Sequence, residues 1–441
     1  MPTAIEIFKH LPKKNCGECK HPTCLAFAMQ LANQKAKLED CPYVSDAGKQ
    51  ALAASSAPPI RLVKVGTGKA TLEMGDETEL YRHDKKFFHP VRYSIIVPDT
   101  LAENDVVSRV QKANAMRFER VGQIMALDMV CVRNDSKDTA RFVATVEKVS
   151  SSTELPIILA SEDPAAIKAA CLRISAKVPL ISAATKANLT EMAAVAKEFK
   201  CPLVVRESNL NDLADMVAKV KLAGIEDIVL DFAPGTLKEL IEKSTVIRKL
   251  SVKKTFRGLG YPLLVNAPAG NRGVTMGLIS TMKYGSIVVF EELLPQMAIP
   301  LFVLRQNIYT DPQVPIQVKP GLYPIGNPTE DSPILFTTNF SLTYFTVLGD
   351  IDKSKVPVWL QVVDCEGLSV LTAFAAGKLT SEGVVHDMDR SGARTKSKKN
   401  VLIIPGMVAR MSPKLAELTG MKIVVGPKES SGLPKMLKSL E

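Results

Sequence analysis

Short, unbroken runs of apolar residues recur along the middle of the chain, and segments with a helical spacing of apolar positions separate them. A strand that is apolar throughout, rather than at alternate positions, is typical of a parallel sheet covered on both faces. Helical spacing is clearest at residues 189–199, 210–222 and 236–250. The predicted strands cover residues 93–97, 127–132, 156–160, 179–182, 202–205, 227–231, 262–266 and 286–291.

Eight strand–helix units within about 220 residues predict a closed (β/α)8 barrel. An open, doubly wound sheet is the alternative that this pattern leaves available. Whichever way the sheet is arranged, the pattern indicates an α/β domain in the middle of the chain.

Polar residues follow most of these strands, at the end where (β/α)8 barrels carry their active residues. Their spacing reveals neither a convergent metal set nor a nucleophile–base pair, so a scaffold or docking barrel is favoured over a catalytic one. Asp163-Pro164 and Ser208-Asn209 are equally expected at the starts of helices. The polar residues are Asp99, Arg133, Asn134, Asp135, Ser161, Glu162, Asp163, Arg206, Glu207, Asp231, Asn266 and Glu291.

A smaller α/β pattern begins at residue 334. Its strands are predicted at residues 334–338, 356–363, 400–404 and 421–425, and its helices begin near Ser341, Leu368, Arg410 and Leu433. Each strand ends in a turn of small or polar residues, where ligands of open α/β sheets bind and where helix N-termini offer N–H groups. The pattern predicts a Rossmann-like α/β ligand-binding domain. Plain strand-to-helix turns are the alternative.

Composition shifts divide the chain into five parts. Residues 1–57 form a cysteine-rich domain, and 58–92 a linker with an edge hairpin built from residues 62–66 and 83–88. The barrel occupies residues 93–310. Six prolines make residues 311–333 an extended connector, because their density disfavours helix and interior strand. Residues 334–441 form the small α/β domain.

Charge and hydropathy narrow the class of protein. The formal charge of +10 is spread over 441 residues with few aromatic side chains, which argues against nucleic-acid binding. No apolar run approaches the roughly 20 residues that span a bilayer. The first ten residues contain Glu6 and Lys9 and lack the apolar core of a signal peptide. We therefore expect a cytoplasmic protein that binds neither membrane nor nucleic acid.

Four of the eight cysteines lie in the first 41 residues, as Cys16-x2-Cys19-x4-Cys24-x16-Cys41. Structural zinc sites usually use two close Cys-x2-4-Cys pairs. Three bunched cysteines and a distant one followed by proline, here Pro42, favour a [4Fe-4S] cluster in the ferredoxin manner. Zinc is the alternative, and disulfides are disfavoured in a reducing cytoplasm. The predicted helix at residues 25–38 has an apolar face of Leu25, Ala28, Met29 and Leu31. The other four cysteines, Cys131, Cys171, Cys201 and Cys365, are expected to be ordinary buried thiols.

The order of these parts resembles a known family. Residues 11–19 (LPKKNCGEC), 22–28 (PTCLAFA) and 41–46 (CPYVSD) closely resemble the cluster motif of corrinoid iron-sulfur protein large (gamma) subunits. That family serves the acetyl-CoA (Wood–Ljungdahl) pathway and the acetyl-CoA decarbonylase/synthase complex. The likeness covers the whole chain, and the amino-terminal motif is its most specific part.

The resemblance implies a methyl-group carrier. A corrinoid in residues 334–441 would accept, as Co(I), a methyl group from methyltetrahydrofolate through a methyltransferase and pass it to acetyl-CoA synthase. The [4Fe-4S] cluster on Cys16, Cys19, Cys24 and Cys41 would re-reduce Co(II). A small, barrel-shaped subunit would complete a heterodimer. The several docking partners imply domain motion, for which the proline-rich connector is the expected hinge.

The resemblance also implies a base-off, cobalamin-type corrinoid without a histidine ligand from the protein. His386, the only histidine after residue 89, does not fit the Asp-x-His-x-x-Gly motif of other corrinoid proteins. The expected contacts with the corrinoid lie at the strand ends, and the Thr372 hydroxyl is expected near cobalt. Alternatively, this hydroxyl donates a hydrogen bond to the helix carbonyl four residues earlier. The expected contacts are Thr338, Thr343, Tyr344, Gly367, Leu368, Ser369, Val370, Leu371, Thr372, Gly406, Met407, Gly426 and Gly432.

Two other functions stay open from the residues alone. An iron-sulfur redox protein or reductive activator could serve a separate corrinoid protein, although residues 426–432 lack the Gly-Lys-Ser/Thr ending of an ATPase loop. A barrel methyltransferase could bind the pterin itself, provided that the polar residues at the strand ends converge on one pocket.

Overall fold

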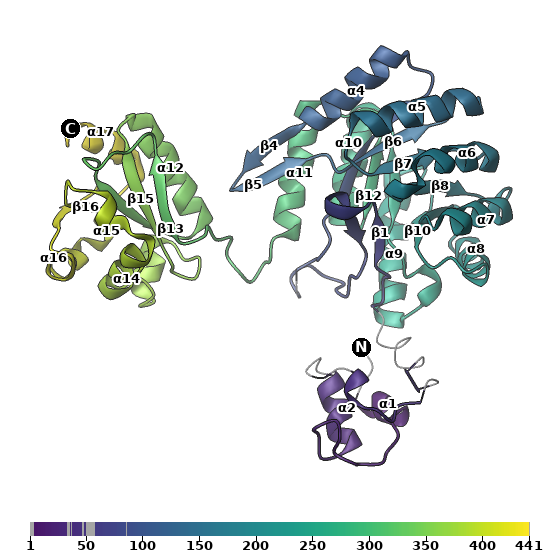
Figure 1. Ribbon diagram of the computed structural model, residues 1–441, viewed down its shortest axis with the longest axis horizontal. Helices are drawn as coiled ribbons and strands as arrows, with labels where there is room; N and C mark the ends of the chain where they lie inside the picture. Colours follow the sequence, from purple (N-terminus) through teal and green to yellow (C-terminus); the bar gives the residue numbers. More distant parts are fainter. Residues whose placement is uncertain are drawn as a thin grey trace. The chain divides into compact units, whose positions relative to one another are not determined.

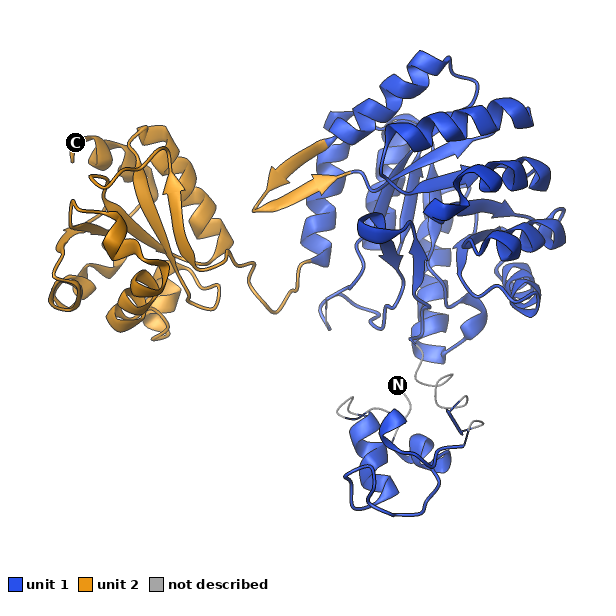
Figure 2. Ribbon diagram, viewed as in Figure 1, with its two compact units in different colours: residues 1–116, 127–309 blue, residues 117–126, 310–441 orange. Residues whose placement is uncertain are grey.

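The computed structural model describes residues 4–32, 36, 38–45, 48–49, 58–84 and 86–440. The chain divides into two compact units, shown in two colours in Figure 2. Unit 1 comprises residues 1–116 and 127–309, and unit 2 comprises residues 117–126 and 310–441. Residues 51–57, at the end of the predicted cysteine-rich domain, lie outside the described residues.

The amino-terminal module consists of short helices around a small apolar core. Helices α1 (Ala4–Lys9) and α2 (Cys24–Ala32) precede the 3-10 turn η1 (Leu38–Asp40). The buried face of α2 carries Cys24, Phe27 and Ala28. The predicted apolar face is therefore wrong in part, because Leu25 and Met29 are 39% and 50% exposed. Residues 33–35 and 37 of the predicted helix lie outside the described residues.

A short antiparallel hairpin precedes the barrel. Strands β1 (Val63–Val65) and β2 (Leu72–Met74) flank the 3-10 turn η2 (Gly68–Ala70). The buried side chains of Val63, Val65 and Met74 pack in the same core cluster as the barrel strands. The hairpin therefore contributes to the barrel core. The second predicted strand piece is wrong, since the described residues between 83 and 88 form no strand.

The central sheet has eight parallel strands, and all eight predicted segments are confirmed as strands. Their order is β10-β9-β8-β7-β6-β3-β12-β11, and a parallel bridge between Leu230 and Leu263 joins its two ends. The sheet therefore closes, which confirms the predicted barrel over the open sheet. The strands are β3 (Arg92–Pro98), β6 (Met129–Arg133), β7 (Ile157–Ala160), β8 (Leu180–Ala184), β9 (Leu203–Arg206), β10 (Ile228–Asp231), β11 (Leu264–Ala267) and β12 (Ile287–Phe290).

A helix follows each barrel strand, and α5 to α8 lie side by side outside the strands in Figure 1. Asp163 caps α6 and Asn209 caps α8 through side-chain oxygens that accept backbone N–H bonds, as expected of helix starts. The helices are α4 (Glu103–Ala115), α5 (Thr139–Ser152), α6 (Pro164–Ile174), α7 (Leu189–Phe199), α8 (Leu210–Leu222), α9 (Leu237–Lys254), α10 (Gly270–Met282) and α11 (Pro295–Tyr309), with the 3-10 turns η3 (Ser175–Lys177) and η4 (Arg257–Leu259).

A second hairpin, which the sequence pattern did not predict, interrupts the barrel between α4 and β6. Its strands β4 (Arg117–Arg120) and β5 (Gln123–Ala126) pair in an antiparallel register around a two-residue turn. Val121 and Gly122 of this turn both have positive φ, at 52° and 69°, which suits a tight hairpin turn. By its contacts the hairpin groups with unit 2.

Unit 2 contains a five-stranded sheet in the order β13-β15-β14-β16-β17. Its strands are β13 (Gly321–Ile325), β14 (Ile334–Thr338), β15 (Val358–Val363), β16 (Val401–Ile404) and β17 (Lys422–Val425). The last four are parallel and appear in the order 2-1-3-4, which is the flavodoxin-like order of a doubly wound sheet and not the Rossmann order. The antiparallel edge strand β13 corrects the predicted connector, part of which belongs to this sheet.

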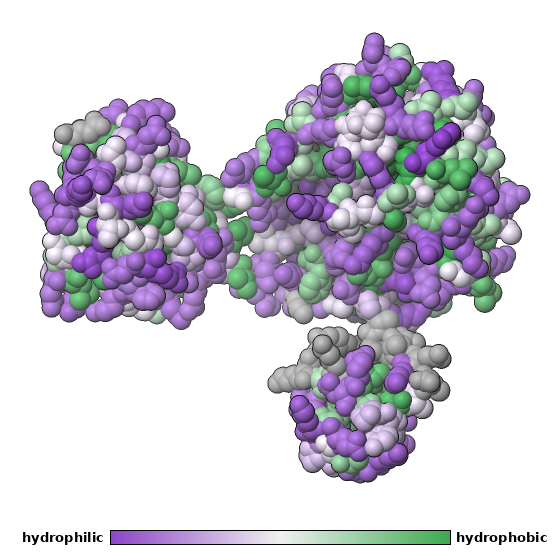
Figure 3. Space-filling model, viewed as in Figure 1, coloured by the Kyte–Doolittle hydropathy of each residue, from purple (hydrophilic) through white to green (hydrophobic). Residues whose placement is uncertain are grey.

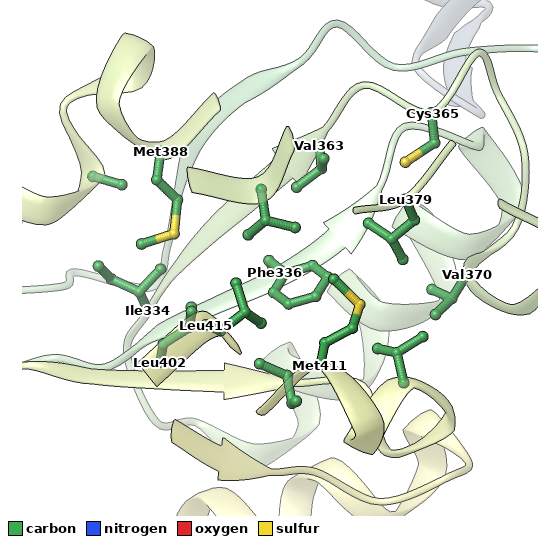
Figure 4. Packing of buried hydrophobic residues seen from close by; sticks show 14 of the residues in the cluster. Ile334, Phe336, Val363, Cys365, Val370, Leu379, Met388, Leu402, Met411 and Leu415 are labelled. Carbon is green, nitrogen blue, oxygen red and sulfur yellow. The ribbon is translucent and has the colours of Figure 1, made fainter. Parts of the chain in front are cut away.

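Alternation along β14 gives the sheet of unit 2 two apolar faces. Ile334 and Phe336 face one core, where Figure 4 shows the Phe336 ring beside Met411, and Leu335 faces the other. Helices α12 and α17 pack together on the Leu335 side, and α14 and α16 pack together with the first core. The helices are α12 (Ser341–Ser354), α13 (Val370–Ala375), α14 (Ser381–Ser391), α15 (Ala393–Lys396), α16 (Ser412–Thr419) and α17 (Leu433–Lys438), with the 3-10 turns η5 (Gly406–Met411) and η6 (Ser430–Gly432).

The surface carries mixed polar and apolar residues. Hydrophilic side chains cover much of the face in view in Figure 3, with hydrophobic side chains interspersed. Across the described residues, no helix combines the length and apolar character needed to cross a membrane.

Candidate functional site

The four amino-terminal cysteines all lie in the small module. Cys19, Cys24 and Cys41 are buried and belong to one apolar cluster with Phe27, while Cys16 is exposed. Cys24 opens α2, and Cys41 directly follows η1. All four are free thiols, so none is held in a disulfide. The module therefore contains all four residues that the sequence predicted as metal ligands, three of them in one apolar cluster.

The loop around Cys16 and Cys19 has an unusual backbone. Lys13, Asn15, Gly17 and Lys20 all have positive φ, between 50° and 76°. Alternation of left-handed residues with ordinary ones turns successive N–H groups inward, and such nests hold anions at many iron-sulfur sites. The backbone N–H of Asn15 donates to Cys24 Sγ at 3.4 Å, and the side-chain Oδ1 of Asn15 accepts from the backbone N–H of Cys24 at 2.8 Å. The backbone thus already provides a donor to one sulfur.

One side-chain hydrogen bond joins the two halves of the cysteine set. Tyr43, two residues after Cys41, donates its hydroxyl to Glu18 Oε1 at 2.8 Å. This hydrogen bond, followed by the Glu18 charge, raises the pKa of Tyr43, and Cys16 and Cys41 add smaller contributions. This hydrogen bond therefore links the loop between Cys16 and Cys19 to the segment that follows Cys41.

The four thiols of the module are the donors that an iron-sulfur cluster requires, although their sulfur atoms do not converge on one point. No three Cys, His, Asp or Glu side chains within the described ranges are arranged to hold a metal ion. The fit rests on four free thiols in one module, three of them buried, and on the left-handed loop. The remaining cysteines are buried as predicted, and burial raises the pKa of the Cys131 and Cys365 thiols to about 12.

The second candidate site is a cavity of about 510 Å³ in unit 2. It lies beyond the carboxyl ends of β14 and β16, which is the point where the strand order of this sheet reverses. Doubly wound sheets bind their ligands at this switch point. Its volume falls in the range of about 300–1,000 Å³ that is usual for ligand sites. The structure therefore has a cavity of ligand size where the sequence predicted a ligand site.

Seven of the predicted contact residues line this cavity. They come from α12, from the turn and first residues of α13, and from the segments after β16 and β17. The Thr372 hydroxyl hydrogen-bonds the Ser369 hydroxyl at 2.9 Å, in place of the alternative bond to a helix carbonyl. The seven are Thr343, Ser369, Val370, Leu371, Thr372, Met407 and Gly426.

The other six predicted contacts lie outside the cavity wall, and most have evident structural roles. Tyr344 is buried beside Tyr323, with ring centroids 5.4 Å apart, and Leu368 packs against the apolar core. A Cβ on Gly406 would meet the Gly426 carbonyl oxygen at 2.4 Å, so Gly406 allows two backbone segments to approach. The six are Thr338, Tyr344, Gly367, Leu368, Gly406 and Gly432.

Several wall residues were missed by the sequence reasoning. Thr346 and Val347 follow the predicted Thr343 by three and four positions, so the helical period of α12 could have identified them. The strand residues gave no signal, because their pattern is that of any buried strand. The missed residues are Leu335, Phe336, Thr337, Leu342, Thr346, Val347, Ile403, Ile404, Pro405 and Leu433, and residues 427–430, between the predicted Gly426 and Gly432, also line the cavity.

The cavity wall is apolar and rich in hydroxyl groups. The Thr337 hydroxyl is buried and has no hydrogen-bond partner among the described residues. Leu342, Leu371 and Met407 line the cavity although they are 59%, 54% and 42% exposed, which is typical of a surface that a ligand or partner covers. His386 does not line it and lies on α14 with a side chain that is 73% exposed. These features fit a large, largely uncharged ligand.

Polar residues predicted at the barrel strand ends converge on a third cavity, of about 580 Å³. Its walls include Arg133, Arg206, Asp231, Asn266 and Glu291. The two arginines are held in ion pairs, so the cavity presents a charged network rather than a nucleophile–base pair.

The fold and these sites define a class of protein: a cysteine-rich module joined to a (β/α)8 barrel and to a doubly wound domain with an apolar, hydroxyl-lined cavity. The family model described as CO dehydrogenase/acetyl-CoA synthase delta subunit matches residues 62–437, and the chain belongs to this family. A second family model, for an Fe-S cluster, matches residues 11–43.

Curated relatives match the chain from end to end. The corrinoid/iron-sulfur protein large subunit of Moorella thermoacetica is 45% identical, over 98% of this chain and 97% of its own. The acetyl-CoA decarbonylase/synthase complex subunit gamma 2 of Methanosarcina mazei is 36% identical, over 98% and 96%. Among solved structures, a dihydropteroate synthase from Coxiella burnetii superposes with a TM-score of 0.40 at 12% identity, covering 51% of this chain and 94% of its own.

Proposed function

We propose that this chain is a methyl-group carrier that binds a corrinoid in unit 2 and a [4Fe-4S] cluster in its amino-terminal module. The cavity at the strand-order reversal, with its hydroxyl-lined wall and exposed apolar mouth, is the observation that carries the proposal. The corrinoid/iron-sulfur name of the 45% identical relative supports the same pair of cofactors. A bound corrinoid would supply the cobalt that takes up a methyl group and releases it.

The cavity wall would hold the corrinoid mainly by apolar contact. Leu342, Leu371 and Met407 would lose their exposed area to the ligand, which favours binding by roughly 25 cal/mol for each Å² covered. The hydroxyls of Thr337 and Thr343 would serve amide groups of the ligand, and the segment after β17 with Lys428 would face its phosphate. His386 lies away from this wall, in keeping with a base-off corrinoid without a histidine ligand.

The cysteines of the module would serve as thiolate ligands of the cluster. Cys16, Cys19, Cys24 and Cys41 supply the four donors that a cubane cluster requires. The Asn15 N–H and the left-handed loop would stabilise sulfur charge by hydrogen bonding. A bound cluster would supply single electrons that return oxidised cobalt to its working state.

The relatives' names also support the proposed partners. They describe large and gamma subunits, so we expect a smaller subunit that forms a heterodimer with this chain. The proposed carrier role requires a donor and an acceptor of the methyl group, which we assign to a methyltetrahydrofolate methyltransferase and to acetyl-CoA synthase. We place this chemistry in the cytoplasm.

An absorbance spectrum of full-length protein purified without oxygen tests the proposal. Corrinoid bands together with a broad iron-sulfur shoulder are the expected result. Cys19→Ala should lose the shoulder and keep the corrinoid bands, whereas the matched variant Cys171→Ala, at a buried cysteine of the barrel, should keep both. A spectrum with iron-sulfur absorption alone, after loading with excess hydroxocobalamin, would overturn the carrier function and favour the redox protein or reductive activator.

A further inference from the structure

The apolar core of the amino-terminal module holds three of the four module cysteines and leaves the fourth outside. Cys19, Cys24 and Cys41 are buried in the cluster that also contains Phe27. Cys16 is exposed and lies outside that cluster. A ligand has to be held in place by its surroundings if its bond to a metal is to persist. For Cys16 that support has to come from contacts other than core packing.

The residues two positions before and two positions after Cys16 both contact the side chain of Tyr43. The Lys14 ammonium lies over the Tyr43 ring, with Nζ 4.0 Å from the ring centroid. The Tyr43 hydroxyl donates to Glu18 Oε1 at 2.8 Å. Tyr43 itself follows Cys41 by two positions. The three side chains thus form a clasp (the Tyr43 clasp) that fastens the Cys16 loop, on both sides of the cysteine, to the segment after Cys41.

Both contacts of the Tyr43 clasp involve a charged group. A hydroxyl that donates to an ionised carboxylate makes a stronger hydrogen bond than one that donates to a neutral acceptor. An ammonium group over an aromatic ring adds a cation–π attraction. Lys14 and Glu18 carry opposite charges, so the clasp adds no net charge beside the thiols. Tyr43 is 40% exposed, so the clasp lies at the surface of the module, as Cys16 does.

The backbone of the Cys16 loop depends on such contacts. Asn15 and Gly17, directly before and after Cys16, have positive φ of 50° and 76°. Left-handed backbone is unfavourable for a residue with a side chain, so Asn15 keeps it only where other contacts compensate. The two hydrogen bonds between Asn15 and Cys24 tie the loop to the start of α2. The Tyr43 clasp supplies the second tie, to the segment after Cys41.

We propose that Lys14, Glu18 and Tyr43 are positioning residues for Cys16, and that Cys16 is the ligand that leaves the cluster first when the clasp is lost. This inference rests on the proposed [4Fe-4S] function of the module. The core still holds the other three cysteines. The Cys16 sulfur leaves its iron, water takes the open position on that iron, and the released thiolate takes up a proton. The step consumes neither an oxidant nor a reductant.

The order in which the cysteines react with iodoacetamide tests this inference. Full-length protein is reconstituted with iron and sulfide without oxygen, and peptide mass spectrometry measures the label at each cysteine. Tyr43→Phe keeps the ring beneath Lys14 and loses the hydroxyl. It should label Cys16 roughly threefold faster than the wild type, because a hydrogen bond at the surface contributes at the lower end of the usual range. The other three module cysteines should keep their wild-type rates.

Substitutions of the acceptor and two matched controls sharpen the test. Glu18→Ala should accelerate labelling of Cys16 as Tyr43→Phe does, and Glu18→Gln, which keeps an uncharged acceptor, should restore part of the protection. Glu39→Ala removes another exposed carboxylate two positions from a ligand cysteine, one that makes no contact with Tyr43 in the described part of the chain. Tyr81→Phe removes the hydroxyl of a similarly exposed tyrosine outside the module. Both controls should label as the wild type does.

The outcomes separate this inference from the proposed function. An unchanged rate at Cys16, or equal acceleration at all four cysteines, in cluster-loaded Tyr43→Phe would overturn the clasp alone. A wild type that takes up no iron and sulfide would overturn the clasp together with the proposed cluster. Circular dichroism verifies the fold of each variant. If Tyr43→Phe does not fold, Glu18→Ala at its exposed position decides by the same two outcomes.

Discussion

Two neighbouring threonines at the end of β14 provide a matched test of the cavity in unit 2. Thr337 and Thr338 are 1% and 0% exposed, and neither hydroxyl has a hydrogen-bond partner among the described residues. Thr337 lines the cavity, and Thr338 does not. Replacement of each by valine removes the hydroxyl and keeps the branched shape that strands favour.

A buried, unsatisfied hydroxyl destabilises a protein by about 1–3 kcal/mol. In the corrinoid-free chain, Thr337→Val and Thr338→Val should each stabilise unit 2 locally by about 1 kcal/mol, a factor of about 5 in the opening equilibrium. Hydrogen-exchange mass spectrometry on peptides that contain β14 measures this as slower exchange in both variants. Faster exchange in either variant would refute the reasoning, because it would mean that the native hydroxyl is hydrogen-bonded.

The two variants should diverge once the ligand is added. If the Thr337 hydroxyl donates to the corrinoid, Thr337→Val loses one hydrogen bond, and affinity for hydroxocobalamin should fall about fivefold, as about 1 kcal/mol predicts. Thr338→Val should bind as the wild type does. Absorbance titration gives both affinities, and equal losses in the two variants would contradict the assignment of the cavity wall.

Three further predictions concern stability. Phe336→Ala should lower the unfolding free energy of unit 2 by about 3–5 kcal/mol, because Phe336 is fully buried, and a loss below 1 kcal/mol in denaturant titration would contradict its central packing. Gly349→Ala, in open space within α12, should raise the melting temperature through helix propensity, whereas Gly406→Ala should lower it because the new Cβ meets the Gly426 carbonyl. Hydrogen bonds from the Asn209 N–H and then Lys186 lower the pKa of Glu207 to about 2. The ionised Glu207 carboxylate therefore stabilises the fold fully at pH values above its unfolded-state pKa near 4.3, and this stabilisation is lost as the pH falls toward 2. The melting temperature of Glu207→Gln should depend less on pH across that window.

The barrel and most of the small domain were predictable because each strand reads as a distinct apolar run. Strands that are buried on both faces contain few polar residues. Their apolar runs can therefore be recognised in the sequence even when the neighbouring strands are unknown. The β4–β5 hairpin gave no such signal. Phe118 is its only aromatic strand residue, the first two residues of β5 are both exposed, and the turn lacks the Asn-Gly pair that marks many hairpins.

The prediction of an extended connector at residues 311–333 was wrong in part, because its prolines did not exclude an edge strand. Pro324 lies within β13, which is at the edge of the sheet and pairs only with β15. Proline is compatible with an edge strand because one side of that strand makes no ladder bonds, and its missing N–H discourages pairing with further strands. Val318 also donates its N–H to the Asn339 carbonyl, so the segment joins the domain even before β13.

The helix of the cysteine module shows the limit of periodicity alone. Leu25, Ala28 and Met29 form one helical face, and Cys24, Phe27 and Ala28 form another that is equally apolar. The structure buries the second face because Cys24 is drawn into the core with Phe27. Only the tertiary contacts of the cysteines distinguish the two faces, and helical spacing does not record them.

The contrast between the two cavities bears on which ligand each can take. Lys428 and Glu429 are the only charged residues among those that line the cavity of unit 2, so its wall imposes little net charge on a ligand. A large ligand with many neutral amides and one phosphate meets no strong repulsion there. At the barrel mouth the same phosphate would face four carboxylates, two of them drawn toward Arg133 and two toward Arg206. On charge, the proposed corrinoid is therefore better accommodated in the cavity of unit 2 than at the barrel mouth.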